Sequence, residues 1–266
     1  MNKIFFSILL LVLSSNSFSA NNDPIKQAIS GSHRAPANKA RDQYRHPQET
    51  LEFFGVTENM TVVEIWPGAG WYTEILAPLL KEHGKLYAAH FAADSSVPYF
   101  QNSLQQFKKK IAGEPEIYNA VILTELQPPG KLTIAPAETV DTVLTFRNIH
   151  NWMKSGQAES VFTAMFAALK SGGILGVVEH RNPVGTKQDT QAESGYVTEK
   201  HVIALANTAG FELLASSEIN ANAKDNAVHP KGVWTLPPAL KLKAIDREKY
   251  LAIGESDRMT LKFIKP

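Results

Sequence analysis

The sequence contains no cysteine, which excludes disulfide bonds and lipid attachment through a thiol. An excess of charge of one sign is also missing. Its 27 Lys and Arg residues are balanced by 26 Asp and Glu residues, so the formal net charge is +1 and gives no electrostatic footprint for nucleic acid. The one dense basic run, residues 108–110, is expected to be a solvated helix end. We therefore expect no nucleic-acid partner.

A long apolar run is absent too, because a membrane-spanning helix needs about 20 apolar residues. The apolar run at the N-terminus covers only residues 4–13; Lys3 precedes it, and small residues follow over 14–20. This order of charge, apolar core and small residues is typical of a secretory signal peptide. We expect residues 1–20 to be removed, leaving a secreted or periplasmic protein without a membrane span. A buried N-terminal helix is the alternative.

The remaining composition, 44% hydrophobic and 20% charged, is that of a folded globular protein. Apolar β-branched runs alternate with segments of helical period, which predicts an open, doubly wound α/β fold with helices on both faces of a parallel sheet. The expected strands are 61–66, 85–91, 118–126, 140–146, 173–180, 211–219 and 258–264, and the expected helices between them include 97–111, 159–170 and 197–209. Glycines at 172 and 173 are expected to cap the second of these helices.

Two segments lie outside this alternation. Residues 21–58 predict an extended arm and then a helix that begins at Pro47. Arg41 and Arg45 precede that helix, and a hydrated loop is the expected setting for them, with closure over a ligand as the alternative. The irregular stretch 217–238 is long enough for a lid, although hydrophilic decoration is the simpler interpretation.

The stretch 61–80, TVVEIWPGAGWYTEILAPLL, is the centre of the predicted fold. A buried strand is followed by a turn that contains Pro67, Gly68 and Gly70, and then by a helix. Such a glycine turn lets the backbone approach a ligand closely, and the helix N-terminus offers free N–H groups. This form is typical of a nucleotide-type site.

With EIWPGAG after the first strand, VDTVLTFRNIHNW at the fourth and LKSGGILGVVEHR through the fifth, the sequence resembles the class I S-adenosylmethionine-dependent methyltransferases. It is similar in particular to a group of exported methyltransferase-like proteins with the signatures HNW (150–152) and GESDRMTLKF (254–263). The resemblance covers the mature chain, with the methyltransferase-like α/β domain at 59–266. It implies a Rossmann-like, mostly parallel sheet whose last strand, 258–264, is antiparallel.

The resemblance also implies roles for individual residues. Glu64, Gly68 and Gly70 would line the methionine end of S-adenosylmethionine, and Glu125 would lie near the adenine. Trp66 stands where the family has the first glycine of the turn, so its indole either walls or fills part of the pocket. His90 stands where the family has an acidic residue for the ribose hydroxyls, and an imidazole cannot provide the paired acceptance of a carboxylate.

The polar residues that follow the fourth and fifth strands are the candidate catalytic groups, because the carboxyl ends of parallel strands meet at one edge of the sheet. His150 or His180 would be the base for the acceptor proton. Arg147 and Arg181 would hold an anionic acceptor by paired hydrogen bonds. The spacing of His90, His150, His180, Glu179, Asp225 and His229 matches no compact ligand motif, so no metal is expected.

The sequence therefore supports two functions. The first is methyl transfer from S-adenosylmethionine to a small or anionic acceptor. The second is binding of another small ligand, without methyl transfer, on a fold descended from methyltransferases. Trp66, His90 and the expected export, away from the cytoplasm where the methyl donor is made, favour the second.

The N-terminal pattern gives a first testable prediction. When the full chain is produced in a secreting bacterial host, the intact mass of the exported protein should correspond to a chain that begins near residue 20. An exported protein that retains residues 4–13 would contradict it.

Overall fold

Seven strands form one mixed sheet in the order β3-β2-β1-β4-β5-β8-β6 in the computed structural model, which describes residues 23–266. Six strands are parallel, and β8 runs antiparallel to its neighbours β5 and β6. The predicted sheet, including its antiparallel last strand, is confirmed. The strands are β1 (Thr61–Ile65), β2 (Lys85–His90), β3 (Val121–Glu125), β4 (Val140–Phe146), β5 (Leu169–His180), β6 (Glu212–Ser217) and β8 (Arg258–Ile264).

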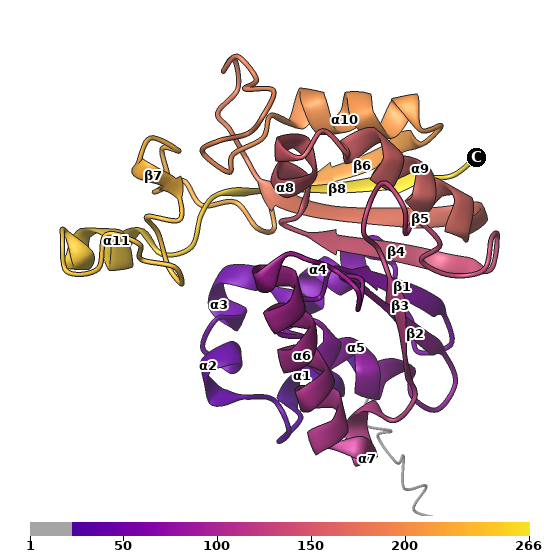
Figure 1. The fold of residues 1–266 in the computed structure, drawn as a ribbon. Helices are drawn as coiled ribbons and strands as arrows, with labels where there is room; N and C mark the ends of the chain where they lie inside the picture. Colours follow the sequence, from indigo (N-terminus) through magenta and orange to yellow (C-terminus); the bar gives the residue numbers. More distant parts are fainter. Residues whose placement is uncertain (1–22) are drawn as a thin grey trace, which may run out of the picture.

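Helices cover both faces of this sheet (Figure 1). Because successive side chains of a strand point to opposite faces, Val63 and Ile65 belong to one apolar cluster and Val62 to the other. The first cluster includes side chains of α8, α9 and α10, and the second those of α1, α4 and α5. The helices that follow β1 are α5 (Thr73–Leu80), α6 (Pro98–Gly113), α7 (Pro115–Tyr118), α8 (Ile149–Lys154), α9 (Ala158–Ala168) and α10 (Glu199–Thr208).

The expected strands 140–146 and 258–264 match β4 and β8 residue for residue, and β1, β2, β3 and β6 lie within their expected ranges. The start of β5 was predicted wrongly. Helix α9 ends at Ala168, and Leu169 already has an extended backbone and pairs with Val140. Gly172, with φ +78°, therefore lies in the irregular first part of β5 and does not cap the helix.

Three short helices occupy the part predicted as an extended arm, α1 (Pro24–Ser30), α2 (Pro36–Lys39) and α3 (Asp42–Arg45), and α4 (Pro47–Phe54) is the helix predicted after it. The predicted start of α4 at Pro47 is confirmed, and α1 and α2 also begin with a proline, which suits the first helical turn. Each of the helices α1 to α3 is too short to show a helical period in the sequence. Arg34 donates a hydrogen bond to Asp42 at 2.8 Å, and Asn38 donates one to Glu74 at 2.9 Å. Because Glu74 belongs to α5, the helix that follows the glycine turn, this segment packs against α5.

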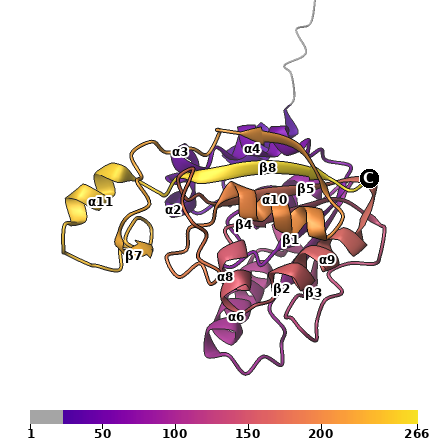
Figure 2. The same cartoon turned by 90° about the horizontal axis from the view of Figure 1, so that it is seen from above.

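The irregular stretch before β8 contains β7 (Pro230–Val233) and α11 (Arg247–Ile253), which extend to one side of the molecule (Figures 1 and 2). Asp225 holds this stretch in place: it accepts hydrogen bonds from the Tyr196 hydroxyl and the Asp257 N–H, both at 2.8 Å, and its other oxygen lies 2.8 Å from His229 Nε2. The predicted signal peptide, 1–20, lies outside the described residues. No helix formed by residues 23–266 has the length and apolar character that a membrane span requires.

Close packing of α4 on β5 gives a prediction of stability. A Cβ atom at Gly176 would lie 2.8 Å from Phe54 Cδ2 and 2.8 Å from Leu144 Cδ2. Gly176→Val should therefore lower the free energy of unfolding by about 1–3 kcal/mol, measured by urea denaturation. Gly113→Ala, at the end of α6 with no atom within 4 Å of the new Cβ, is the control and should not destabilise the protein. Equal urea midpoints for Gly176→Val and wild type would contradict this packing.

Candidate functional site

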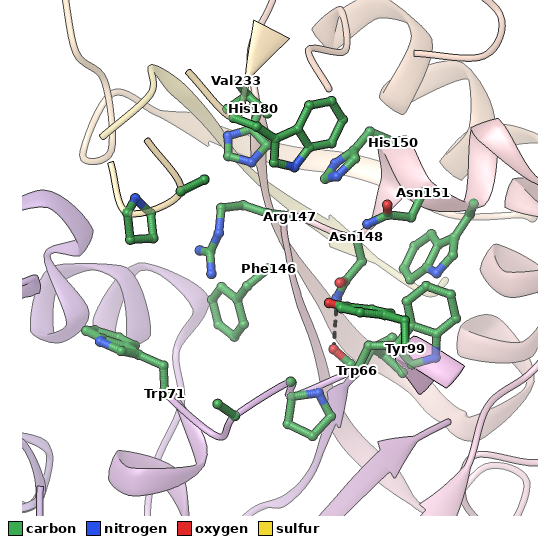
Figure 3. A pocket seen from close by; sticks show the side chains of 18 of the residues that line it. Trp66, Trp71, Tyr99, Phe146, Arg147, Asn148, His150, Asn151, His180 and Val233 are labelled. Carbon is green, nitrogen blue, oxygen red and sulfur yellow. Dashed lines mark hydrogen bonds between the residues drawn. The ribbon is translucent and has the colours of Figure 1, made fainter. Parts of the chain in front are cut away.

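A cavity of about 1030 Å³ opens at the carboxyl ends of β1 and β4 (Figure 3). Its walls come from the turn after β1, the segment after β4, helix α3, and the residues in and after β7. Six of the residues predicted from the sequence line it: Glu64, Trp66, Gly68, Arg147, His150 and His180. Four predicted residues do not line it: Gly70, His90, Glu125 and Arg181.

The turn between β1 and α5 has left-handed backbone at Trp66, Gly68 and Gly70, with φ of +44°, +58° and +81°. A Cβ atom at Gly68 would meet no atom within 4 Å, so this residue faces open space at the cavity wall. At Gly70, the same test gives Lys110 and Phe107 of α6 at 3.2–3.3 Å. Gly68 thus keeps the cavity open, whereas Gly70 allows α6 to pack on the turn.

The indole of Trp66 forms one wall of the cavity. Its Nε1–H donates to the Leu126 carbonyl at 2.8 Å, and its ring centroid lies 4.6 Å from Phe91 and 5.7 Å from Trp152. The cavity continues past the indole to Tyr99 and Gln127. Trp66 therefore narrows the cavity without closing it.

His90 is fully buried beneath the turn and its ring nitrogens are both used. Nδ1 accepts the Phe91 N–H at 2.8 Å, so Nε2 carries the proton and donates to the Gly68 carbonyl at 3.2 Å. Burial lowers the pKa of His90 to about 4, which keeps the ring neutral. The imidazole supports the turn and has no nitrogen left for a ligand.

Glu125 lies outside the cavity as well. It accepts the Ala93 N–H at 2.8 Å and lies 3.0 Å from Lys131 Nζ. These two contacts lower its pKa. Asp94, the other acidic residue near this end, is exposed and lies 3.7 Å from Lys131. The end of β2 therefore presents no carboxylate to the cavity.

Glu64 is the carboxyl group on the cavity wall below the turn. It is only 2% exposed, and its Oε2 accepts from the Thr73 hydroxyl at 2.6 Å. Burial raises the pKa of Glu64 to about 7, although the Thr73 hydrogen bond and the charges of Arg147 and Lys110 act in the opposite direction. This carboxyl group therefore titrates near neutral pH, and its second oxygen is free to bind a ligand.

His150 and His180 lie side by side on another wall, with ring centroids 5.4 Å apart. Glu179, fully buried, accepts the N–H groups of Ile149 at 2.6 Å and His180 at 2.8 Å, and lies 3.1 Å from His150 Nδ1. Because a carboxylate only accepts, His150 Nδ1 donates and its Nε2 keeps a free lone pair. His180 Nδ1 is bonded to the Ser256 hydroxyl, and burial lowers the pKa of His180 well below its ordinary value.

His150, Glu179 and His180 are also the one group within residues 23–266 whose potential ligand atoms lie close enough for a metal ion, within 4.8 Å of one another. Both Glu179 oxygens already accept N–H groups, however, and the positive charge of Arg147 lies on the same cavity wall. The group fits a hydrogen-bonded histidine better than a metal centre.

The two predicted anion-binding arginines have different surroundings. Arg181 lies 2.7 Å from Glu218 and 2.8 Å from Asp257, and these two carboxylates raise its pKa; it also pairs with Glu199. Arg147 lines the cavity, and its guanidinium makes no hydrogen bond or ion pair to residues 23–266. Its backbone has φ +64°, and burial lowers its pKa to about 10.

Other lining residues come from segments for which closure over a ligand was only the alternative interpretation of the sequence. Arg41 and Arg45 reach the cavity from α3 and the turn before it, and Glu255 reaches it from the turn before β8. Trp71 and Trp234 add apolar walls. Only the polar character of residues 41–46 and 254–258 hinted at these positions, because the two segments are more than 200 residues apart.

The raised pKa of Glu64 predicts a specific pH dependence. Between its ordinary value of 4.5 and about 7, the unfolded chain loses the proton while the folded protein keeps it, so stability falls as the pH rises. Glu64→Gln removes this pH dependence. As the pH rises from about 4 to about 8, the free energy of unfolding of the variant should therefore increase by about 3 kcal/mol relative to that of wild type, measured by urea denaturation. Glu125→Gln should show the opposite sign in a different range: the pKa of Glu125 is lowered from 4.5, so this variant should lose stability relative to wild type as the pH rises toward about 4.5 and show little further change above it. A Glu64→Gln difference that does not change with pH would contradict the burial argument.

Comparison with known proteins identifies the fold. No protein-family model and no curated protein matches the sequence. Among solved structures, an S-adenosylmethionine-dependent methyltransferase from Aquifex aeolicus has a TM-score of 0.56 at 17% identity, over 92% of this chain and 99% of that chain. Geranyl diphosphate methyltransferase in complex with S-adenosylmethionine gives 0.55 at 11% identity, over 91% and 95%. The cyclase SpnF gives 0.55 at 15%, over 91% and 92%. The chain therefore has the fold of the class I S-adenosylmethionine-dependent methyltransferases.

Proposed function

We propose that the protein transfers a methyl group from S-adenosylmethionine to a small, anionic acceptor. The observation that carries the proposal is the glycine turn of a methyltransferase fold opening, at Gly68 and Glu64, onto a cavity of about 1030 Å³. One structural neighbour, geranyl diphosphate methyltransferase, is named for an acceptor with charged phosphate groups. The likeness of fold supports this function, and the test is direct binding.

The residues of the cavity fit the methyl donor at its methionine end. Glu64 is a buried carboxyl group with a free oxygen and a pKa of about 7, and a nearby ammonium group would favour its ionised form. Gly68 leaves room for the ligand beside it. At the nucleoside end, Trp66 and Tyr99 offer aromatic surface for stacking in place of a carboxylate for the ribose.

When bound, S-adenosylmethionine supplies an electrophilic methyl group on a sulfonium sulfur. His150 would be the base: the acceptor's nucleophilic atom would bond to the methyl carbon, the bond between that carbon and the sulfur would break, and the acceptor's proton would pass to Nε2 of His150. Glu179 fixes the tautomer through Nδ1 and stabilises the imidazolium that forms. Trp234, whose ring lies 5.9 Å from His150, excludes water from this wall.

A second candidate function is binding or conversion of another small ligand without methyl transfer. Two observations favour it: His90 has no free nitrogen for the ribose, and the Trp66 indole occupies part of the nucleoside end. The structural neighbour SpnF is named as a cyclase, so this fold is not restricted to one reaction.

We also propose that the protein is exported, like the group of methyltransferase-like proteins that its HNW and GESDRMTLKF motifs resemble. The support is the charged and apolar N-terminal pattern around Lys3.

Binding of S-adenosylmethionine and S-adenosylhomocysteine to the purified mature protein, measured by calorimetry, tests the proposal. Gly68→Val should weaken binding by about tenfold or more, because its side chain would project into the cavity. Gly185→Val is the matched control: Gly185 also has positive φ and no atom within 4 Å of its Cβ position, but lies outside the cavity. Both variants place a β-branched side chain at positive φ, and only Gly68 lines the cavity, so only the first should lose binding.

The absence of binding at millimolar ligand, with the protein folded, would favour the second candidate function. Unchanged affinity in Gly68→Val would show that the turn is not the site.

A further inference from the structure

Several arginines surround a single carboxylate at one end of the cavity. Glu255 is 4% exposed and lies 3.3 Å from Arg45 Nε and 2.8 Å from Arg258 Nη2, and it also pairs with Arg41. Burial alone would raise its pKa, but these three guanidinium groups lower the pKa of Glu255 to about 2. One full negative charge therefore faces three positive charges before Arg147 is counted.

Arg147 adds a fourth positive charge, with no hydrogen-bond or ion-pair partner for its guanidinium among residues 23–266. In Figure 3 its guanidinium lies between the rings of Phe146 and His180, toward the open part of the cavity. Its left-handed backbone, φ +64°, is uncommon for a residue with a side chain, and such strain is concentrated at functional sites. Arg147 is half-buried, and a partly desolvated cation without a partner among residues 23–266 is stabilised by an anion bound beside it, so anion binding should stabilise the folded protein.

Arg45 has unused binding capacity at the same end. Its side chain is 3% exposed, its guanidinium lies 4.6 Å above the Trp71 ring, and its buried Nη1 has no hydrogen-bond partner within the described chain. Burial, and then the charge of Arg147, lower the pKa of Arg45 well below its ordinary value. Arg45 and Arg147 thus act on each other by repulsion that an anion between them would relieve.

We infer that Arg147 and Arg45 form an oxyanion site for the acceptor, and that the acceptor carries a carboxylate or phosphate group. Arginine presents several N–H donors in a fixed geometry that suits both groups. The carboxylate of the methyl donor, S-adenosylmethionine, is another oxyanion that could bind these arginines. The positive charge exceeds what that carboxylate can neutralise, because four arginines face Glu255 and the partly neutral Glu64; Asp257 also acts on Arg258, but it is paired with Arg181. The assignment of this site to the acceptor rests on the proposed methyl transfer. The existence of an oxyanion site does not depend on that proposal.

Calorimetric titration of the mature protein with inorganic phosphate, and separately with acetate, at constant ionic strength tests the inference. We expect saturable binding of at least one of the two anions. Arg147→Gln should weaken it by about tenfold or more. Arg247→Gln, which removes the same charge from the exposed start of α11, should bind like wild type.

A thermal melt gives a second readout that a merely structural arginine would not show. Without anion, Arg147→Gln should melt at a higher temperature than wild type, because the uncompensated charge is gone. The binding anion should raise the melting temperature of wild type and leave that of the variant nearly unchanged. The same titration is also carried out with Arg45→Gln, which changes the other arginine of the site.

The source of the oxyanion is decided by repeating the titration with saturating S-adenosylhomocysteine. Anion binding that persists assigns the site to the acceptor, and competition overturns that assignment in favour of the donor's carboxylate. Anion binding by a protein that binds neither donor nor product supports the oxyanion site while the proposed function fails. No saturable binding of either anion to folded protein, or equal affinity in Arg147→Gln, overturns the inference.

Discussion

The carboxylate of Glu255 is the interaction on which one end of the cavity depends. It joins Arg41 and Arg45, before and within α3, to Arg258 at the start of β8, and so connects segments more than 200 residues apart. Without it, three buried or half-buried guanidinium groups would repel one another. A buried ion pair that loses one partner leaves an uncompensated charge, so the packing of these segments depends on Glu255.

Two carboxyl groups of the cavity show how surroundings decide function. Glu255, among three arginines, has a pKa of about 2 and remains charged, whereas Glu64, buried with one hydroxyl partner, has a pKa of about 7. The first therefore maintains structure at any physiological pH. The second changes charge near neutrality and responds to a cationic ligand. Environments that separate the pKa values of similar groups are typical of functional sites.

The turn after β1 and the end of β2 are where the chain departs from the residue pattern that its resemblance to methyltransferases implies, although the fold is shared. The departures at Trp66 and His90 were visible in the sequence. Their consequences were not: the indole bonds to the Leu126 carbonyl and leaves the cavity open, while the imidazole is buried beneath the turn. Which neighbour each ring nitrogen meets depends on side chains from other strands, and no local pattern records it.

The sequence by itself determined the sheet, because strands such as 140–146 and 258–264 are apolar runs bounded by turn residues, and these signals act between neighbours in the chain. It also determined the glycine turn, with Glu64 and Gly68 on the cavity wall. Only the tertiary structure decided that Arg181 is neutralised by Asp257 and Glu218, that Arg147 has no ion-pair partner in the part of the chain the structure describes, and that Arg45 reaches the cavity. Partners in charge pairing come from distant segments, and only packing brings those segments together.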